Sequence, residues 1–199
     1  MSKFTANAQA LKSALKAVMK TTGTEEFLDK IAIQASKGSL YLISTNMYIL
    51  GIHKIDAKLK QKKDFTHVMR QANAKTLAEW LNGKKEVAFS ISEKEGCVVF
   101  KVKETGKDNY IELAETITDF PNIAQFLEYA DCQPKSDELV PATVRAMQGR
   151  VIKKAFSIFS ARCILDFMQP KDDCGVNKPV YVRQGGALVV VMPVKVEDV

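Results

Sequence analysis

One feature constrains the fold of this 199-residue chain more than any other: the same order of predicted elements occurs twice. That order is a short strand, an amphipathic helix and three further strands, and it fills the segments 1–60 and 61–125. Turn residues such as Lys37-Gly38 and Glu95-Gly96 separate strands of alternating or β-branched composition. The predicted strands are 3–5, 31–35, 39–45 and 48–55 in the first unit, and 65–69, 86–92, 97–103 and 110–114 in the second.

The helix of each unit carries a single apolar face. The first helix is predicted over residues 7–20, and its apolar face holds Ala8, Leu11, Leu15 and Val18. The second is predicted over residues 73–82, and its apolar face holds Ala74, Leu77, Ala78 and Leu81. A helix with one apolar face packs against a sheet. We therefore predict an α+β fold built from repeated β-α-β-β-β units, with the helices on one face of antiparallel sheets.

The rest of the chain holds a third, incomplete unit. Prolines and charged residues precede it, a composition typical of a linker or of an irregular crossing segment. One helix within 142–160 follows, with Ile152, Ala155, Phe156 and Phe159 on one side, and then three predicted strands at 162–169, 180–183 and 187–196. We divide the chain into a two-unit domain, 1–125, a connecting segment, 126–141, and a third unit, 142–199.

The distribution of charge favours a polyanionic partner. The chain has 29 Lys and Arg against 23 Asp and Glu, a formal net charge of +6, which suits nucleic acid. Basic residues lie opposite the apolar faces of the predicted helices or, for Arg70, near the start of one: Lys12, Lys16 and Lys20, then Arg70 and Lys75, then Arg150, Lys153 and Lys154. We predict that these residues contact DNA. The alternative is an ordinary solvated helix surface, and Glu79 on the exposed side of the second helix favours that alternative there.

No catalytic residue, metal ligand or cofactor is predicted. The sequence lacks a glycine-rich phosphate loop and the H-E-x-x-H and G-x-S-x-G motifs. Its four cysteines lack C-x-x-C spacing, and we expect Cys97 and Cys163 to pack as small hydrophobic residues. An apolar run of about 18 residues and a secretory leader are also absent. We therefore expect a cytoplasmic protein that has no enzymatic activity and does not bind membranes.

Several segments resemble the bacterial DNA polymerase III beta sliding clamp. Each is short, but they occur in the same order as in that family. They are Lys3-Phe4-Thr5, Ile31-Ala32-Ile33-Gln34-Ala35, Gly38-Ser39-Leu40-Tyr41-Leu42, Thr45-Asn46-Met47-Tyr48, Asp119-Phe120-Pro121 and the C-terminal run from Val189 to Val196 with its Met192-Pro193 pair.

The resemblance implies a DNA-clamp fold and a ring-forming homo-oligomer. Such a ring encircles double-stranded DNA without regard to sequence and tethers a replicative polymerase. The resemblance also implies that the polymerase and the clamp loader bind through a short linear peptide. Part of its apolar pocket would be Met192, Pro193 and Val194, although a plain terminal core strand is the alternative for this run.

The chain departs from the family pattern in its length. Family members carry six such units per chain, whereas three are predicted here, so a ring with the same number of helices would need four chains. The strand 97–103 is, by analogy, a possible subunit contact, and Glu25 and Glu26 stand where the family often has a basic residue. Two alternatives stay open. The chain could be a clamp-like regulator or mimic that binds replication proteins without closing around DNA, or a monomeric basic processivity factor.

Overall fold

The structure is a computed structural model that describes residues 1–25, 28–36, 38–46, 48–60, 63–118, 120, 139–141, 149–159, 166–170, 180–184 and 186–191. The first unit consists of β1 (Ser2–Asn7), α1 (Ala8–Val18), the 3-10 turn η1 (Met19–Thr21), β2 (Lys30–Ser36), β3 (Ser39–Thr45) and β4 (Ile49–Ile55). The second consists of β6 (Phe65–Arg70), α2 (Gln71–Trp80), β7 (Glu86–Lys94), β8 (Cys97–Glu104) and β9 (Tyr110–Thr116), after a short strand β5 (Ala57–Leu59). The third consists of β10 (Leu139–Pro141), α4 (Gly149–Phe156), β11 (Asp166–Pro170), β12 (Val180–Gln184) and β13 (Ala187–Val191).

These strands form two antiparallel sheets, and the first two units exchange their opening strands. Sheet A has the order β5-β1-β7-β8-β9, and sheet B has the order β10-β11-β12-β13-β4-β3-β2-β6. Strand β1 of the first unit pairs with β7 of the second, while β6 of the second pairs with β2 of the first. Neither unit is therefore complete without the other. In the third unit, β10 lies beside β11 in the same way as β6 lies beside β2.

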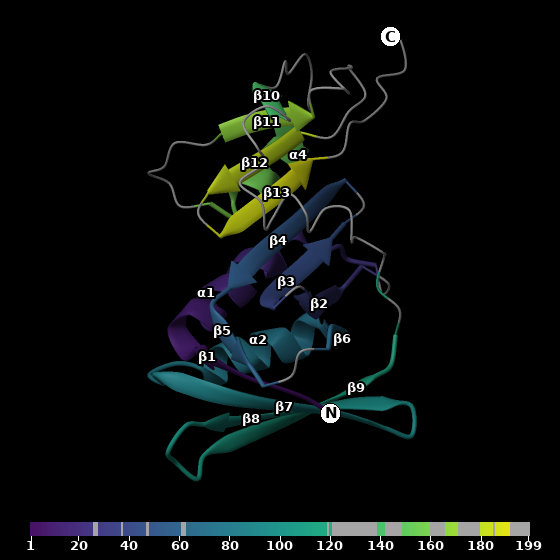
Figure 1. The fold of residues 1–199 in the computed structure, drawn as a ribbon. Coiled ribbons are helices and arrows are strands. Elements are labelled where there is room, and N and C mark those ends of the chain that lie inside the picture. The colour runs from purple at the N-terminus through teal and green to yellow at the C-terminus, as the bar shows by residue number, and fades with distance from the viewer. Residues whose placement is uncertain are drawn as a thin grey trace.

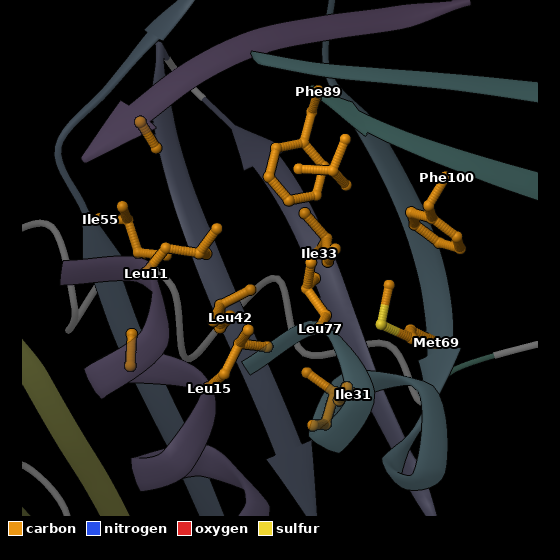
Figure 2. Close-up of a cluster of buried hydrophobic side chains, with 14 of the residues drawn as sticks. Leu11, Leu15, Ile31, Ile33, Leu42, Ile55, Met69, Leu77, Phe89 and Phe100 are labelled. Atoms are coloured by element: carbon orange, nitrogen blue, oxygen red, sulfur yellow. The ribbon is translucent and has the colours of Figure 1, made fainter. Parts of the chain in front are cut away.

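Helices α1 and α2 lie between the two sheets and supply the main core (Figure 1). Figure 2 shows Leu11 and Leu15 of α1 beside Leu42 of sheet B, and Phe89 and Phe100 of sheet A close to the same cluster. All eight apolar residues predicted for the two helix faces are buried, as their spacing indicated. Burial of each large aliphatic or aromatic side chain contributes about 1.5–3 kcal/mol. The packed faces leave one side of each helix open to solvent.

Sheet B joins the third unit to the first. Strand β13 pairs antiparallel with β4 over five residue pairs, from Ala187 opposite His53 to Val191 opposite Ile49. Alternate residues pack on opposite faces of this joint, because side chains of a strand alternate in direction. On one face Ile52 packs with Leu188, and on the other Val189 packs with Phe159, which follows α4. The third unit is thus part of a continuous sheet rather than a separate body.

Three expectations from the sequence are wrong. The connection after β4 contains an additional strand, β5, which pairs with β1 at the edge of sheet A. Strand β8 is not available as a subunit edge, because β7 and β9 pair with it on both sides. Cys97 is exposed rather than packed, since it begins β8 beside a turn, and Cys163 lies outside the described residues.

In the part of the chain that the structure describes, no helix has both the length and the apolar character needed to cross a membrane.

Candidate nucleic-acid interface

Helix α1 begins directly at the end of β1 and presents a basic stripe to solvent. Asn7 caps the helix, and its Oδ1 accepts hydrogen bonds from the backbone N–H groups of Gln9 at 3.0 Å and Ala10 at 2.9 Å. Because the apolar face is buried against the sheets, the lysines at four-residue intervals lie on the opposite side. Lys16 and Lys20 are exposed and Lys12 is half-buried.

The N-terminal half of α1 is fastened to the end of α2. The Gln9 side-chain amide donates to the backbone carbonyls of Leu81 at 3.3 Å and Lys84 at 3.2 Å. The Lys12 ammonium donates to Asn82 Oδ1 at 2.8 Å. These contacts set two helices from different units side by side, so their solvent faces form one surface.

The other end of α1 is fastened to the third unit by two reciprocal lysine contacts. The Lys20 ammonium donates to the backbone carbonyl of Ser157, and the Lys154 ammonium donates to the carbonyl of Thr22 at 2.7 Å. Each lysine satisfies a carbonyl at the end of the other unit's helix, where carbonyls lack intrahelical partners. Helices α2, α1 and α4 therefore form a continuous layer, which we call the helix layer.

Among the side chains that the structure describes, the third unit contributes one exposed lysine to this layer. Lys153 is exposed, whereas Lys154 is half-buried, and burial lowers the pKa of its ammonium group. Lys154 thus faces the junction instead of the open side of the helix, unlike the position that its spacing predicted. The backbone of Arg150 lies in α4, but its side chain is outside the described residues.

Helix α2 is capped by a residue of a distant strand. The buried carboxylate of Glu115 accepts the backbone N–H of Arg70 at 2.7 Å and the amide of Asn73 at 2.9 Å. Arg70 Nε also lies 3.8 Å from this carboxylate, so its guanidinium is held beside Glu115. The helix consequently starts at Gln71, two residues earlier than predicted. Lys75 and Glu79 are both exposed on its open side, which makes α2 the least basic part of the helix layer.

A network of hydroxyl groups underlies the junction between α1 and α4, and sequence reasoning missed it. Thr21 Oγ1 donates to the carbonyl of Val18 at 2.8 Å and also contacts Ser44 Oγ, and all three groups are buried. Gly51 of β4 passes directly beneath this network. A Cβ atom at position 51 would lie 2.4 Å from Thr21 Oγ1 and 3.2 Å from Cδ1 of Ile158. Any residue larger than glycine at position 51 would force these side chains to shift.

The buried histidine, His67, lies between the two sheets. His67 is buried in β6, with Nε2 2.9 Å from Ser2 Oγ and Nδ1 3.2 Å from Glu93 Oε1. Burial lowers the pKa of His67, and the nearby Glu93 carboxylate opposes that shift without cancelling it. These contacts join His67 of sheet B to Ser2 and Glu93 of sheet A and give the histidine a structural setting between the two sheets.

The residues predicted to bind a partner peptide, Met192, Pro193 and Val194, lie outside the described residues, as does Glu26. The strand that leads to them, β13, is buried throughout and ends at Val191. Glu25 is exposed just after α1 and η1.

The arrangement of elements can be compared with known proteins. No protein-family model matches the sequence, and no curated protein shows significant similarity to it. Solved structures do match. A sliding clamp of Pseudomonas aeruginosa has a TM-score of 0.67 and 11% identity, and the match covers 98% of this chain and 66% of the clamp. The DNA polymerase III beta subunit of Thermotoga maritima has a TM-score of 0.66 and 11% identity, covering 99% and 65%. The Bacillus subtilis sliding clamp has a TM-score of 0.64 and 12% identity, covering 98% and 64%.

Two units that exchange opening strands, with helices between antiparallel sheets, define the DNA-clamp fold. More particularly, this chain has the fold of the DNA polymerase III beta sliding clamps, as its short sequence motifs predicted. At 11–12% identity this likeness concerns the fold alone. The chain spans about two thirds of the length of the clamps that it matches.

Proposed function

We propose that this chain is the subunit of a DNA sliding clamp, a non-enzymatic processivity factor that encircles duplex DNA and tethers a replicative polymerase to it. The observation that carries the proposal is the helix layer. Three helices are joined side by side through contacts of Gln9, Lys12, Lys20 and Lys154, and exposed lysines project from their open side. The sheets lie on the remaining sides of the helices.

A ring needs this arrangement because it holds DNA by topology. Contacts to phosphates position a protein on DNA but carry no base sequence. Lysine side chains on one curved surface can exchange phosphates freely as the duplex moves past. Lys16 of α1, Lys75 of α2 and Lys153 of α4 are exposed lysines, one on each helix of the layer, and we assign them this role. Lys12 and Lys20 donate to neighbouring residues and keep remaining ammonium protons for phosphate, while Arg150 completes the set.

Ring closure would require the pairing of sheet edges between copies of the chain. The described edges are β5 and β9 in sheet A and β10 and β6 in sheet B. Of these, β9 has the greatest length, seven residues, so we assign the subunit contact to β9 in place of β8. In this proposal residues 1–125 act as one clamp domain and 142–199 as a half-domain, and Met192, Pro193 and Val194 contribute to a pocket for peptides of the polymerase and the loader.

The oligomeric mass and the DNA affinity together test this function. Light scattering is expected to give one defined homo-oligomer larger than a dimer. The triple variant Lys16→Gln, Lys75→Gln, Lys153→Gln is expected to weaken duplex binding and to reduce the slope of log K against log salt by about 2.7, that is about 0.9 per lysine. Its control is Lys60→Gln, Lys63→Gln, Lys94→Gln, since these exposed lysines follow β5 or end β7, in sheet A.

A monomer would overturn the ring. The second candidate function is a clamp-like regulator that binds replication proteins without closing around DNA, because at 11% identity the likeness to solved clamps concerns the fold and not ring closure. A monomeric protein whose duplex affinity is the same for both triple variants would support that regulator and contradict the clamp.

A further inference from the structure

The outer face of sheet A carries a second basic surface that the helix layer does not use. Along β1, β7 and β8 every second side chain points into the core, as Phe4, Phe89 and Phe100 do. The intervening side chains therefore point away from the helices. On these three strands they are exposed or half-buried, and they include Lys3, Thr5, Ala88, Ser90, Ser92, Val99, Lys101 and Lys103.

Lysines flank a line of small side chains on this face. Ser90 of β7 is paired with Lys3 of β1 on one side and with Lys101 of β8 on the other. In the next row, Ala88 lies between Thr5 and Lys103, and Thr5 is paired with Lys58 of β5. The small side chains of β7 thus form a line between Lys101 and Lys103 of β8 on one side and Lys3 of β1 and Lys58 of β5 on the other. We call this surface the β7 trough.

The β7 trough is positively charged. Four exposed lysines, Lys3, Lys58, Lys101 and Lys103, border it. Three carboxylates stand nearby: exposed Glu86 at the start of β7, Glu112 opposite Lys101, and Asp108, whose Oδ1 accepts from Lys103 Nζ at 2.9 Å. The lysines outnumber the carboxylates, and they lie on both sides of β7. This surface therefore favours an anionic ligand that extends along β7.

An exposed aromatic ring stands at the same border. Tyr110 of β9 is paired with Lys103, and 54% of its surface is exposed. The Lys101 ammonium lies 4.5 Å from the centroid of this ring. Lysines beside an aromatic residue on an open sheet are the chemistry by which proteins hold single-stranded nucleic acids, since bases stack on the ring and phosphates meet the cations.

The exposed ring of Tyr110 favours a single strand over a duplex. The bases of a single strand are free to stack on an aromatic side chain, whereas the bases of a duplex are already paired and stacked on one another. We propose that the β7 trough binds single-stranded nucleic acid without sequence preference, with phosphates between the two lysine rows and one base on Tyr110. The proposal does not depend on ring closure, because the trough lies on the face opposite to the helix layer.

Fluorescence anisotropy of the full chain with an oligothymidylate of about 20 nucleotides tests the proposal. The triple variant Lys3→Gln, Lys58→Gln, Lys101→Gln is expected to reduce the salt slope by about 2, since each phosphate contact of a single strand contributes about 0.7. Tyr110→Ala is expected to weaken binding about fivefold or more through lost stacking. The matched control is the helix-layer triple variant, which is expected to keep its affinity for oligothymidylate and to lose affinity for duplex.

Three results would overturn the proposal. The first is an equal loss of oligothymidylate affinity in the helix-layer triple variant, which would place the single strand there. The second is an unchanged affinity in the β7-trough triple variant whose circular dichroism matches that of the unmodified protein. The third is displacement by polyglutamate at equal charge concentration together with no effect of Tyr110→Ala, which would make the surface a site for acidic peptides.

Discussion

Replacement of Gly51 by alanine tests how tightly the first and third units are joined. The new Cβ would lie 2.4 Å from Thr21 Oγ1, far inside contact distance, while Ile158 closes the other side at 3.2 Å. Overpacking of this kind costs about 1–3 kcal/mol. Loss of glycine's freedom in the unfolded chain returns about 0.4–1 kcal/mol. We expect Gly51→Ala to lower the free energy of unfolding by about 1–2 kcal/mol net.

A double-mutant cycle identifies the cause. Thr21→Ala removes the hydroxyl that the new Cβ strikes, and by itself costs about 1–2 kcal/mol because its hydrogen bonds to Val18 and Ser44 are lost. In the double variant, the Cβ added at position 51 occupies the space that the Thr21 hydroxyl has left. Its destabilisation is therefore expected to fall short of the sum by about 1 kcal/mol or more, well beyond the additivity error of about 0.3–0.5 kcal/mol.

Urea unfolding followed by circular dichroism gives the four free energies. Thr21→Ser is the matched control, because it keeps the hydroxyl and should not relieve Gly51→Ala. Additive effects of Gly51→Ala and Thr21→Ala, or equal relief by serine, would refute the packing that we describe at this junction.

Further predictions concern the cap of α2, the buried histidine and the exposed thiol. Glu115→Ala should lower the free energy of unfolding by about 2 kcal/mol, because Arg70 N–H and the Asn73 amide lose a charged partner, whereas exposed Glu112→Ala should change it by less than about 0.5 kcal/mol. Burial lowers the pKa of His67, so the unfolded chain takes up the proton at higher pH than the folded protein. The stability from this group is then present above pH of about 6.5 and lost as the pH falls through the folded pKa, and His67→Gln should flatten urea-derived stability between about pH 7.5 and 5.5. Cys97 should react with a thiol reagent in the native state, and Cys97→Ser should remove one rapidly reacting thiol.

Each of these has a contradicting result. Equal effects of Glu115→Ala and Glu112→Ala would contradict the capping of α2 by Glu115. An unchanged pH profile in the histidine variant would contradict the buried setting of His67, and an unreactive Cys97 would contradict its exposure.

Local patterns in the sequence predicted much of this fold. The faces of α1 and α2 follow from spacing alone, because an amphipathic helix needs only its own residues to define its buried side. Leu11, Leu15 and Leu77 are accordingly all buried. Both units show the same order of predicted elements, one strand, one helix and three strands. This repeat also predicted the α+β architecture.

Contacts between distant residues escaped prediction. The carbonyls that hold Lys20 and Lys154 belong to residues more than 130 positions away in the chain, so helix periodicity could only assign both lysines to an open face. Strand β8 was expected at an edge, although β9 pairs beyond it, and no local pattern reveals the order of strands in a sheet. The cap of α2 by Glu115 is of the same kind, because sequence rules look for a cap immediately before the helix.

In the proposed function, copies of this chain close around duplex DNA with the helix layer inward. The direct measurement is retention on a nicked circular plasmid, after subunits diluted apart have been reassembled in its presence, during gel filtration at about 0.5 M salt, which screens phosphate contacts. We predict that the protein stays with the circle and is released when a restriction enzyme linearises it. Equal release from circular and linear DNA, by a protein that light scattering shows to be oligomeric, would contradict the claim.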